Sequence, residues 1–309
     1  MNTTQPYIEI GKKLLSEGIQ TEDRTDVGTY SLFGYNIRFD VSKYAPFITE
    51  RKIPLRSVIG ELLWFIEGSV NTDVLLNDYR CSFWNEWASD TTRTIGPMYG
   101  KQWRDCNGVD QLALMLKTAI AKPTSRRMLV NVWVPELVPG DDAPPKFNPE
   151  NGLMSLAPCH FSYQLKIYNI RSDFRIVNLQ FNLRSSDYFL GLPNNIASYY
   201  ILQRLICSYL TRKTGIRHSP KDLIATCGDI HVYNNHVDVC SELFSREPSP
   251  IQPSFKMSEE IVDIFESYID GSFNEIEDKP KARRSFVNLM YRAIEDYHPG
   301  AVIEGARNV

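Results

Sequence analysis

The sequence lacks the patterns that identify several large classes of protein. It has no run near the ~20 consecutive apolar residues of a membrane-spanning helix, and residues 1–20 are polar, without the apolar core of a signal peptide. With 34 basic and 37 acidic residues, the net charge is -3, which argues against a nucleic-acid coat or a membrane surface as the main partner. A site for a small anion needs only a local arginine cluster, so that class stays open.

The six cysteines lack the spacing of a metal or disulfide framework. No two of them form a C-x-x-C pair and no zinc template fits, so we expect no metal site. Free thiols and the missing signal segment predict a reduced, cytoplasmic protein. Glycine-rich phosphate loops, internal repeats and low-complexity tracts are missing as well.

The 309 residues, of which 43% are hydrophobic, are enough for one large core. Hydrophobic spacing predicts helices over residues 7–16, 57–68, 110–121, 196–211 and 234–246, and strands over residues 30–39, 128–134, 161–168, 175–183 and 222–233. These elements follow no regular strand–helix–strand order. We therefore predict an α+β fold, residues 1–309 as one domain, around a mixed or mostly antiparallel sheet. The proline-rich residues 136–152 are interpreted as a long surface loop.

The stretch Pro158-Cys159-His160 is the strongest candidate for chemistry. Proline fixes the backbone and removes a hydrogen-bond donor just before the alternating run 161–168, so Cys159 is expected at the entrance of a strand. A thiol there is a candidate nucleophile, because the thiolate is the reactive form. Alternatively it is a small buried hydrophobe. His160 need not contact it, since neighbouring strand residues point to opposite faces.

Two further residues are unusual for their surroundings. Glu61 lies in the middle of an almost wholly apolar helix, where a carboxylate needs either a structural partner or a catalytic role with a raised pKa. Tyr99 stands between the turn residues Gly96-Pro97 and Gly100, and we expect it to be exposed. Paired arginines at 126 and 127 suit a phosphate or are simply solvated.

Eight motifs, taken in their order, resemble those of the thymidylate synthase family along nearly the whole chain. They are Asp23-Arg24-Thr25 with Gly28-Thr29, Glu61-Leu62-Leu63-Trp64-Phe65, Trp84-Asn85-Glu86-Trp87, Gly96-Pro97-Met98-Tyr99-Gly100-Lys101-Gln102-Trp103-Arg104, Ser125-Arg126-Arg127, Ala157-Pro158-Cys159-His160, the run from Arg184-Ser185-Ser186-Asp187 to Pro193, and the run from Gly228-Asp229-Ile230-His231 to His236. Each is weak alone, and together they are highly specific.

The resemblance implies a fold, a reaction and catalytic residues. It implies a thymidylate-synthase-like fold, a large, mostly antiparallel sheet flanked by helices. Cys159 would add to C6 of the uracil ring of dUMP, so that C5 can attack the methylene of 5,10-methylenetetrahydrofolate. Glu61 would move protons through water near the ring's C4 oxygen, and Tyr99 would help to remove the C5 proton. His160 would line the site.

The resemblance also implies binding residues and an obligate homodimer. Asn195 would pair with O4 and N3 of the base, which favours uracil over cytosine because an amide both donates and accepts. The 5′-phosphate would be held by Arg24, Arg184 and Ser185, with Arg126 and Arg127 of the neighbouring subunit. The ribose would be bound by His231 and Tyr233, and the substrates also contact Asp187. Folate contacts would come from Trp84, Asp187, Leu190, Gly191, Asn194 and Val309.

The chain departs from the family pattern at several positions. Leu183 replaces a glutamine, Asn194 replaces a phenylalanine that packs on folate, and the tail is polar at Arg307-Asn308. The loop at 136–152 also looks longer than usual. Polar groups on the folate side could hold a water. Because the reactive adduct on the base is protected only while water is excluded, a held water could add to it. We expect a slight preference for water addition, giving 5-hydroxymethyl-dUMP, with reduction to dTMP plus dihydrofolate as the alternative.

Two alternative functions, from other classes of protein, have less support in the sequence. A non-catalytic nucleotide-binding relative is disfavoured, because Cys159, Glu61, Tyr99 and Asn195 are all present. A cysteine hydrolase would need a histidine base. The candidates His231 and His236 are better explained by sugar binding and by the core.

Overall fold

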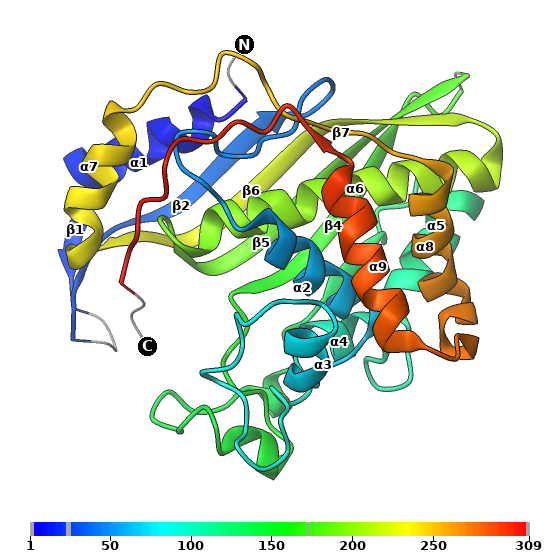
Figure 1. Cartoon of the computed structure of the whole chain (residues 1–309), viewed down its shortest axis with the longest axis horizontal. Helices are drawn as coiled ribbons and strands as arrows, with labels where there is room; N and C mark the ends of the chain where they lie inside the picture. The colour runs from blue at the N-terminus through cyan, green and yellow to red at the C-terminus, as the bar shows by residue number, and fades with distance from the viewer. Residues whose placement is uncertain (1–2, 23–25, 172, 307–309) are drawn as a thin grey trace.

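A mixed six-stranded sheet is the centre of the fold (Figure 1), which is described here by a computed structural model for residues 3–22, 26–171 and 173–306. Its strand order is β1-β2-β6-β5-β4-β3. Neighbouring strands pair antiparallel except β5 and β6, which are parallel. The predicted α+β class with a mixed, mostly antiparallel sheet is confirmed. The strands are β1 (Ile19–Thr21), β2 (Thr29–Asp40), β3 (Leu129–Asn131), β4 (His160–Tyr168), β5 (Phe174–Asp187) and β6 (Arg217–Tyr233).

Helices pack around this sheet, and two short strands form a second, separate sheet. The helices are α1 (Gln5–Glu17), α2 (Leu55–Glu67), α3 (Thr72–Asn77), α4 (Tyr99–Arg104), α5 (Gln111–Ala121), α6 (Gly191–Thr214), α7 (Val237–Ser245), α8 (Glu259–Asp270) and α9 (Lys279–Arg292). This second sheet pairs β7 (Ser254–Phe255) antiparallel with β8 (Ile294–Glu295), and α8 and α9 lie between them in the chain. Among the described residues, no helix is long and apolar enough to cross a bilayer.

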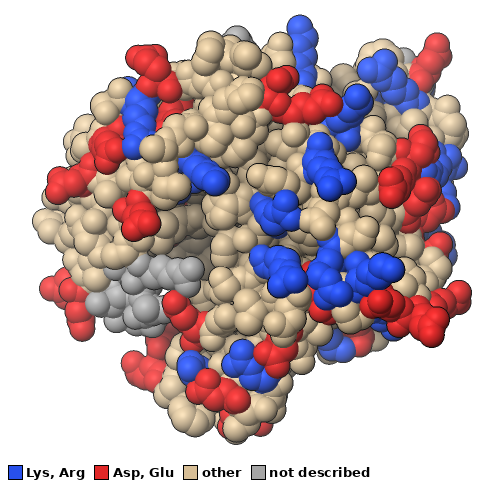
Figure 2. Space-filling model, viewed as in Figure 1, with Lys and Arg blue, Asp and Glu red and all other residues tan. Residues whose placement is uncertain are grey.

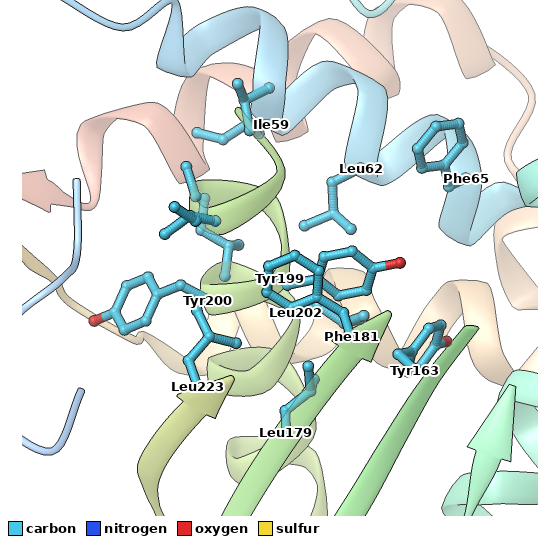
Figure 3. Close-up of a cluster of buried hydrophobic side chains, with 14 of the residues drawn as sticks. Ile59, Leu62, Phe65, Tyr163, Leu179, Phe181, Tyr199, Tyr200, Leu202 and Leu223 are labelled. Atoms are coloured by element: carbon cyan, nitrogen blue, oxygen red, sulfur yellow. The ribbon is translucent and has the colours of Figure 1, made fainter. Parts of the chain in front are cut away.

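The main core lies between α6, the sheet and α2 (Figure 3). The ring of Phe181 on β5 stacks on Tyr199 of α6 at 4.4 Å between centroids. Leu62 and Phe65 of α2 are buried in the same cluster. Each fully buried side chain of this size contributes roughly 1.5–3 kcal/mol through the hydrophobic effect. This packing fixes α2, which carries Glu61, relative to the sheet.

The opposite face of the sheet carries a ladder of polar side chains, because residues alternate between faces along a strand. Gln180 donates to Asn182 and to Thr226, at 3.1 and 2.9 Å. Thr226 donates to Asn36 at 2.7 Å, and Asn182 donates to Ser162 at 3.0 Å. We call these five residues the polar ladder.

The structure corrects several predicted boundaries, including the end of α6, which reaches Thr214 instead of residue 211, and the start of β6, which is Arg217 instead of residue 222. The strand predicted over residues 128–134 is only Leu129–Asn131, because β3 is an edge strand whose chain soon leaves the sheet. β5 continues to Asp187 instead of ending at 183, since its last residues pair with β6. α6 begins at Gly191, five residues before the predicted start, because the turn after Asp187 leads directly into the helix.

The proline-rich residues 136–152 form a surface segment with two short 3₁₀ helices, η1 (Pro135–Leu137) and η2 (Asn148–Asn151). Glu150 of this segment accepts hydrogen bonds from Ser89 and Thr91, at 2.8 and 2.6 Å. The hydroxyl bonds lower the pKa of Glu150. The segment is therefore fixed to the stretch that carries Trp84.

Candidate active site

One edge of the sheet collects most of the predicted site residues. β5 and β6 run parallel, so their carboxyl ends meet at the same edge, where Ser185 lies beside Asp229 and Asp187 beside His231. β4 runs antiparallel to β5, so its entrance reaches that edge too, and the amide of Arg184 donates to the Cys159 carbonyl at 2.9 Å. The topology thus joins three segments that are far apart in sequence.

Cys159 stands immediately before β4, as the sequence predicts, and is partly buried. Its amide donates to the hydroxyl oxygen of Tyr99 at 3.1 Å. The guanidinium of Arg184 donates to the carbonyls of Pro158 and Ala157, at 3.1 and 2.8 Å. These bonds fix the backbone on both sides of the thiol. Arg184 uses two of its three nitrogens here, which leaves N–H donors for an anion.

Tyr99 was predicted to be exposed, and this is wrong: it is 2% exposed. It opens α4 with φ at 28°, a backbone conformation that is strained for a bulky residue and that occurs mainly where surrounding structure enforces it. The Trp84 and Phe65 rings enclose it, with centroids 5.4 and 5.1 Å away. Burial raises the pKa of Tyr99 well above its ordinary value, so its hydroxyl stays protonated.

His160 lies in the site, but it is not a charged neighbour of the Cys159 thiol. Its ring stacks on Tyr99, with centroids 4.1 Å apart, and its Nδ1 lies 2.9 Å from the hydroxyl of Tyr199. Burial lowers the pKa of His160 to about 3. The imidazole is therefore neutral at neutral pH and serves as a buried ring that orders Tyr99.

Glu61 projects from α2 toward the same aromatic group. Its Oε1 accepts a hydrogen bond from Nε1 of Trp84 at 2.7 Å. Burial raises the pKa of Glu61 to about 7, although the Trp84 bond opposes the shift. Near neutral pH both protonation states are populated, which is the condition under which a carboxyl group transfers protons best. Glu61 thus has both the structural partner and the raised pKa that the sequence analysis named, and its catalytic role stays a prediction.

Replacing Glu61 by glutamine is expected to raise the free energy of unfolding by about 2 kcal/mol at about pH 8 and to leave it unchanged at about pH 4. The folded-state pKa of about 7 lies above the ordinary value of 4.5. The folded protein therefore holds this proton more tightly than the unfolded chain does, and stability is lost as the pH rises between those values. Glutamine carries no charge and keeps an oxygen for Trp84.

Urea unfolding of both proteins at the two pH values measures this difference. An equal change at both pH values would contradict the explanation, because a packing effect does not depend on the ionisation of Glu61.

His231 and Tyr233 are two residues apart on β6, so both side chains point to the same side of the strand, with ring centroids 5.2 Å apart. Nδ1 of His231 lies 2.5 Å from Asp229, which also accepts a bond from Ser31 at 2.5 Å. Burial raises the pKa of Asp229, but the bonds from His231 and Ser31 outweigh it and leave a lowered value. Asp229 therefore orients His231 with Nε2 turned away from it.

Asp187 organises the turn between β5 and α6. Its Oδ1 accepts hydrogen bonds from the amides of Phe189 and Leu190, at 2.9 and 3.1 Å. Asn194 and Asn195 follow on the first turn of α6 and are partly buried. The turn therefore places predicted folate and base contacts beside one another.

Some predicted residues lie elsewhere. Arg126 and Arg127 are exposed before β3, at the end of that strand farther from Cys159, because Leu129 pairs with Gln164 and Asn131 with Ser162. The two arginines do not join this chain's own site. Leu183, one of the departures, is 1% exposed and belongs to the core. Arg24, Arg307, Asn308 and Val309 lie outside the described residues.

The surface is hollowed near these segments. Figure 2 shows a hollow in the face that Figure 1 presents, near the end of the described C-terminal segment. Within the described ranges, no group of three or more His, Cys, Asp or Glu side chains is placed to hold a metal ion. The six cysteines are free thiols.

Two residues of this site were missed by the sequence analysis. Tyr199 lies in a long apolar helix, where nothing distinguishes it from a core residue, yet its hydroxyl meets His160. Asp229 carries a signal that could have been used, since an acid two residues before a histidine on a strand shares its face. Its bond to His231 follows from that spacing.

Comparison with known proteins agrees with this geometry. The sequence model described as thymidylate synthase matches residues 5–289. The thymidylate synthase of Francisella tularensis subsp. holarctica is 39% identical over 277 residues, which cover 89% of this chain and 96% of that protein. The chain belongs to the thymidylate synthase family. The thymidylate synthase of Francisella philomiragia is 38% identical over the same shares of both chains.

Family membership confirms the resemblance on which the site prediction rests. The match runs from the start of α1 into α9 and includes all the elements that carry the described site residues. The roles of individual residues remain predictions, which the geometry above makes specific.

Proposed function

We propose that this chain transfers a one-carbon unit from 5,10-methylenetetrahydrofolate to C5 of dUMP and forms dTMP and dihydrofolate. The observation that carries the proposal is the fixed turn at Cys159, held by Tyr99 and Arg184 beside the carboxyl ends of β5 and β6. A fixed thiol beside a carboxyl group with a pKa of about 7 suits addition to a ring followed by proton transfer.

Each residue has one task in this proposal. The Cys159 thiolate adds to C6 of the uracil ring, which makes C5 nucleophilic. C5 forms the new bond to the one-carbon unit and later loses its proton, which the Tyr99 hydroxyl helps to remove. Glu61 passes protons through water to and from the C4 oxygen. Loss of the C5 proton breaks the bond between the one-carbon unit and the folate nitrogen and leaves a methylene on C5. When that methylene receives the hydride supplied by the co-substrate it becomes the methyl group, the C6–S bond breaks, and Cys159 leaves as the thiolate.

The nucleotide is held by groups that match its parts. Ser185 and the unused N–H donors of Arg184 face a phosphate, which guanidinium groups bind well. His231, oriented by Asp229, and Tyr233 bind the ribose hydroxyl. The Asn195 amide accepts from N3–H and donates to O4, as uracil requires.

The residues present fit a folate co-substrate, which supplies the one-carbon unit and the hydride. Trp84 and Trp87 form an aromatic wall, with centroids 5.7 Å apart, next to Glu61. A flat ring can stack on such a wall. The further folate contacts that the proposal assigns, Leu190, Gly191 and Asp187, come from the turn before α6.

Formation of 5-hydroxymethyl-dUMP is the second candidate. The sequence analysis prefers it slightly, and the observation in its favour is the partly buried Asn194 on the first turn of α6. An amide there could hold a water near C5. The names of the relatives favour the methyl product instead, and we therefore place dTMP formation first.

Mass spectrometry of the product, with the ultraviolet signal of dihydrofolate, separates the two. Purified protein is given dUMP and methylenetetrahydrofolate. Methylated nucleotide with stoichiometric dihydrofolate supports the first proposal. A product heavier by one oxygen, without dihydrofolate, supports the second, and Asn194→Phe is then expected to shift the product toward dTMP. If neither product forms, both proposals are contradicted.

We propose further that the active form is a homodimer in which each chain supplies Arg126 and Arg127 to the other's phosphate site. Both arginines are exposed and far from this chain's own thiol. The polar ladder occupies a sheet face that is opposite to the core and only partly exposed over Gln180, Asn182 and Thr226. If a second copy packs on that face by a two-fold axis, the end of one sheet that carries Arg126 and Arg127 comes to lie beside the Cys159 end of the other sheet.

Mixing two inactive variants is expected to restore about a quarter of the wild-type activity, because about half of the dimers are mixed and each has one intact site. One variant is Cys159→Ser and the other carries Arg126→Ala with Arg127→Ala. The subunits are exchanged in mild denaturant and turnover is measured after its removal. Each variant alone, treated identically, is the control. Absence of any gain would contradict the shared site.

A further inference from the structure

Arg283 on α9 joins two helix ends that belong to another part of the chain. Its guanidinium donates to both carboxylate oxygens of Glu67, the last residue of α2, and the bond from Nε measures 3.0 Å. Nη1 donates to Asp78, the C-cap of α3, at 2.9 Å. The three side chains are at most 13% exposed, and Figure 1 shows α9 packed beside α2. A buried guanidinium that forks between two carboxylates holds them in one geometry.

Tyr79 makes a second connection at the same place. Its hydroxyl donates to Oε2 of Glu67 at 2.6 Å and lies 2.9 Å from the hydroxyl of Tyr268 on α8. The Arg283 guanidinium lies over the rings of Tyr79 and Phe273, at 5.8 and 5.6 Å from their centroids. The C-terminal end of α2 is therefore held by α9 and by the residues that follow α3.

Residues 78–84 also reach the carboxyl group proposed for proton transfer. They run from Asp78 to Trp84, whose Nε1 donates to Glu61 at 2.7 Å. They touch α2 one residue before Glu61, because a Cβ atom at Gly60 would lie 2.3 Å from the carbonyl oxygen of Tyr79. Glu61 and Trp84 thus meet across the contact between α2 and residues 78–84, and Arg283 holds the same two elements together.

The surroundings of Glu61 depend on how closely these two elements pack. Burial raises the pKa of Glu61 to about 7, against the effect of the Trp84 bond. Its charge also acts on Tyr99 of α4 and Tyr199 of α6, whose pKa values are raised mainly by burial, so both hydroxyls stay protonated. Water that enters between α2 and residues 78–84 would solvate the carboxylate and lower its pKa toward the ordinary value.

We propose that Arg283 is a positioning residue for proton transfer, because by joining Glu67 to Asp78 it keeps α2 closed on residues 78–84 and keeps Glu61 enclosed beside Trp84. Arg283 touches no reacting group and acts through the two elements that carry Glu61 and Trp84. The enclosure of Glu61 rests on the contacts above, whereas its effect on turnover rests on the proposed function.

Two variants loosen this junction in different ways. Arg283→Lys keeps the charge but cannot form the fork. The triple variant Arg283→Met, Glu67→Gln, Asp78→Asn removes the buried charges together, a change that commonly leaves stability unchanged, and Gln at 67 keeps an oxygen for Tyr79. Arg212→Met is the matched control, because Arg212 joins the last turn of α6 to three carboxylates of α8.

The indole N–H resonance of Trp84 tests the enclosure without any ligand, because this group donates to Glu61. In protein labelled with ¹⁵N-tryptophan and assigned with Trp84→Phe, the wild-type resonance is expected to titrate with a midpoint near pH 7. In the triple variant the midpoint is expected to fall by about one pH unit, and in Arg283→Lys by less, because water then reaches the carboxylate. An unmoved midpoint in both variants, or an equal movement in Arg212→Met, would overturn the proposal.

Turnover separates the enclosure from the proposed function. With dUMP and methylenetetrahydrofolate, kcat of the triple variant is expected to fall about tenfold, because the proton-transfer group is less well placed. The maximum of kcat/KM is expected to move to lower pH together with the Trp84 midpoint. KM for dUMP is expected to change less than about twofold, since the predicted nucleotide contacts lie outside α2 and residues 78–84.

An unmoved pH profile of kcat/KM beside a moved Trp84 midpoint would overturn the proton-transfer role of Glu61, and with it the effect on turnover, while the enclosure by Arg283 stands. A KM for dUMP that rises as much as kcat falls would overturn the positioning role, because it would show a general loss of the shape of the site.

Discussion

Cys159→Ser is expected to lower turnover by about four orders of magnitude or more while dUMP still binds. A serine hydroxyl ionises far less readily than a thiol, so the nucleophile is lost, whereas its size is nearly unchanged. The contacts that fix the turn involve the Cys159 amide and carbonyl and the carbonyls of residues 157 and 158. Serine keeps all of them, so the site retains its shape.

Product formation by mass spectrometry and dUMP binding by calorimetry measure the two parts of this prediction. Cys106→Ser is the control, since Cys106 lies in the turn after α4 and is partly exposed. Turnover of Cys159→Ser within tenfold of the wild type would remove Cys159 from the chemistry. Loss of both turnover and dUMP binding would show instead that the thiol contributes to the shape of the site.

Glu61→Gln is expected to lower kcat by about 10²- to 10⁴-fold, the usual effect of losing a proton-transfer group. A carboxyl group that both gives and takes a proton works best where its two forms coexist. The pKa of about 7 therefore predicts a maximum of wild-type kcat/KM near pH 7. Glutamine keeps the oxygen that accepts from Trp84, so the local geometry is retained.

The pH dependence of kcat/KM in both proteins gives the measurement. The residual activity of Glu61→Gln is expected to lose the dependence centred near pH 7. Glu9→Gln is the control, because Glu9 is an exposed residue of α1. An unchanged pH profile in Glu61→Gln would mean that another group titrates. This result and the stability change of the same variant have one cause, a carboxyl group held in low-dielectric surroundings.

Local patterns predicted most of the secondary structure. Gly18 ends α1 and Ser258 caps α8 with its side chain, in line with the residue types that commonly end and begin helices. The strand after Cys159 and the buried helix around Glu61 follow from period-two and helical spacing. Boundaries failed where pairing with a neighbour decides them: β5 extends to Asp187 because β6 accompanies it.

The candidate site was predicted in a different way. Spacing alone marked Cys159 and Glu61 as unusual, and it left open that both have purely structural roles. The roles of Asn195, Asp187 and His231 came from the resemblance, which the family match supports. Tyr99 shows what local sequence patterns cannot predict. Its neighbouring glycines and proline indicate a turn, but they do not indicate which side chains cover it.

The sequence by itself determined the class of fold, the element order and the position of the thiol at a strand entrance, because these depend on periodicity and on backbone restraints between near neighbours. Tertiary structure decided what surrounds each reactive group. The Tyr99 hydroxyl meets an amide 60 residues away, and Trp84 meets Glu61 across 23 residues. Burial and charge at a site come from such distant contacts, and these also set the pKa of Glu61.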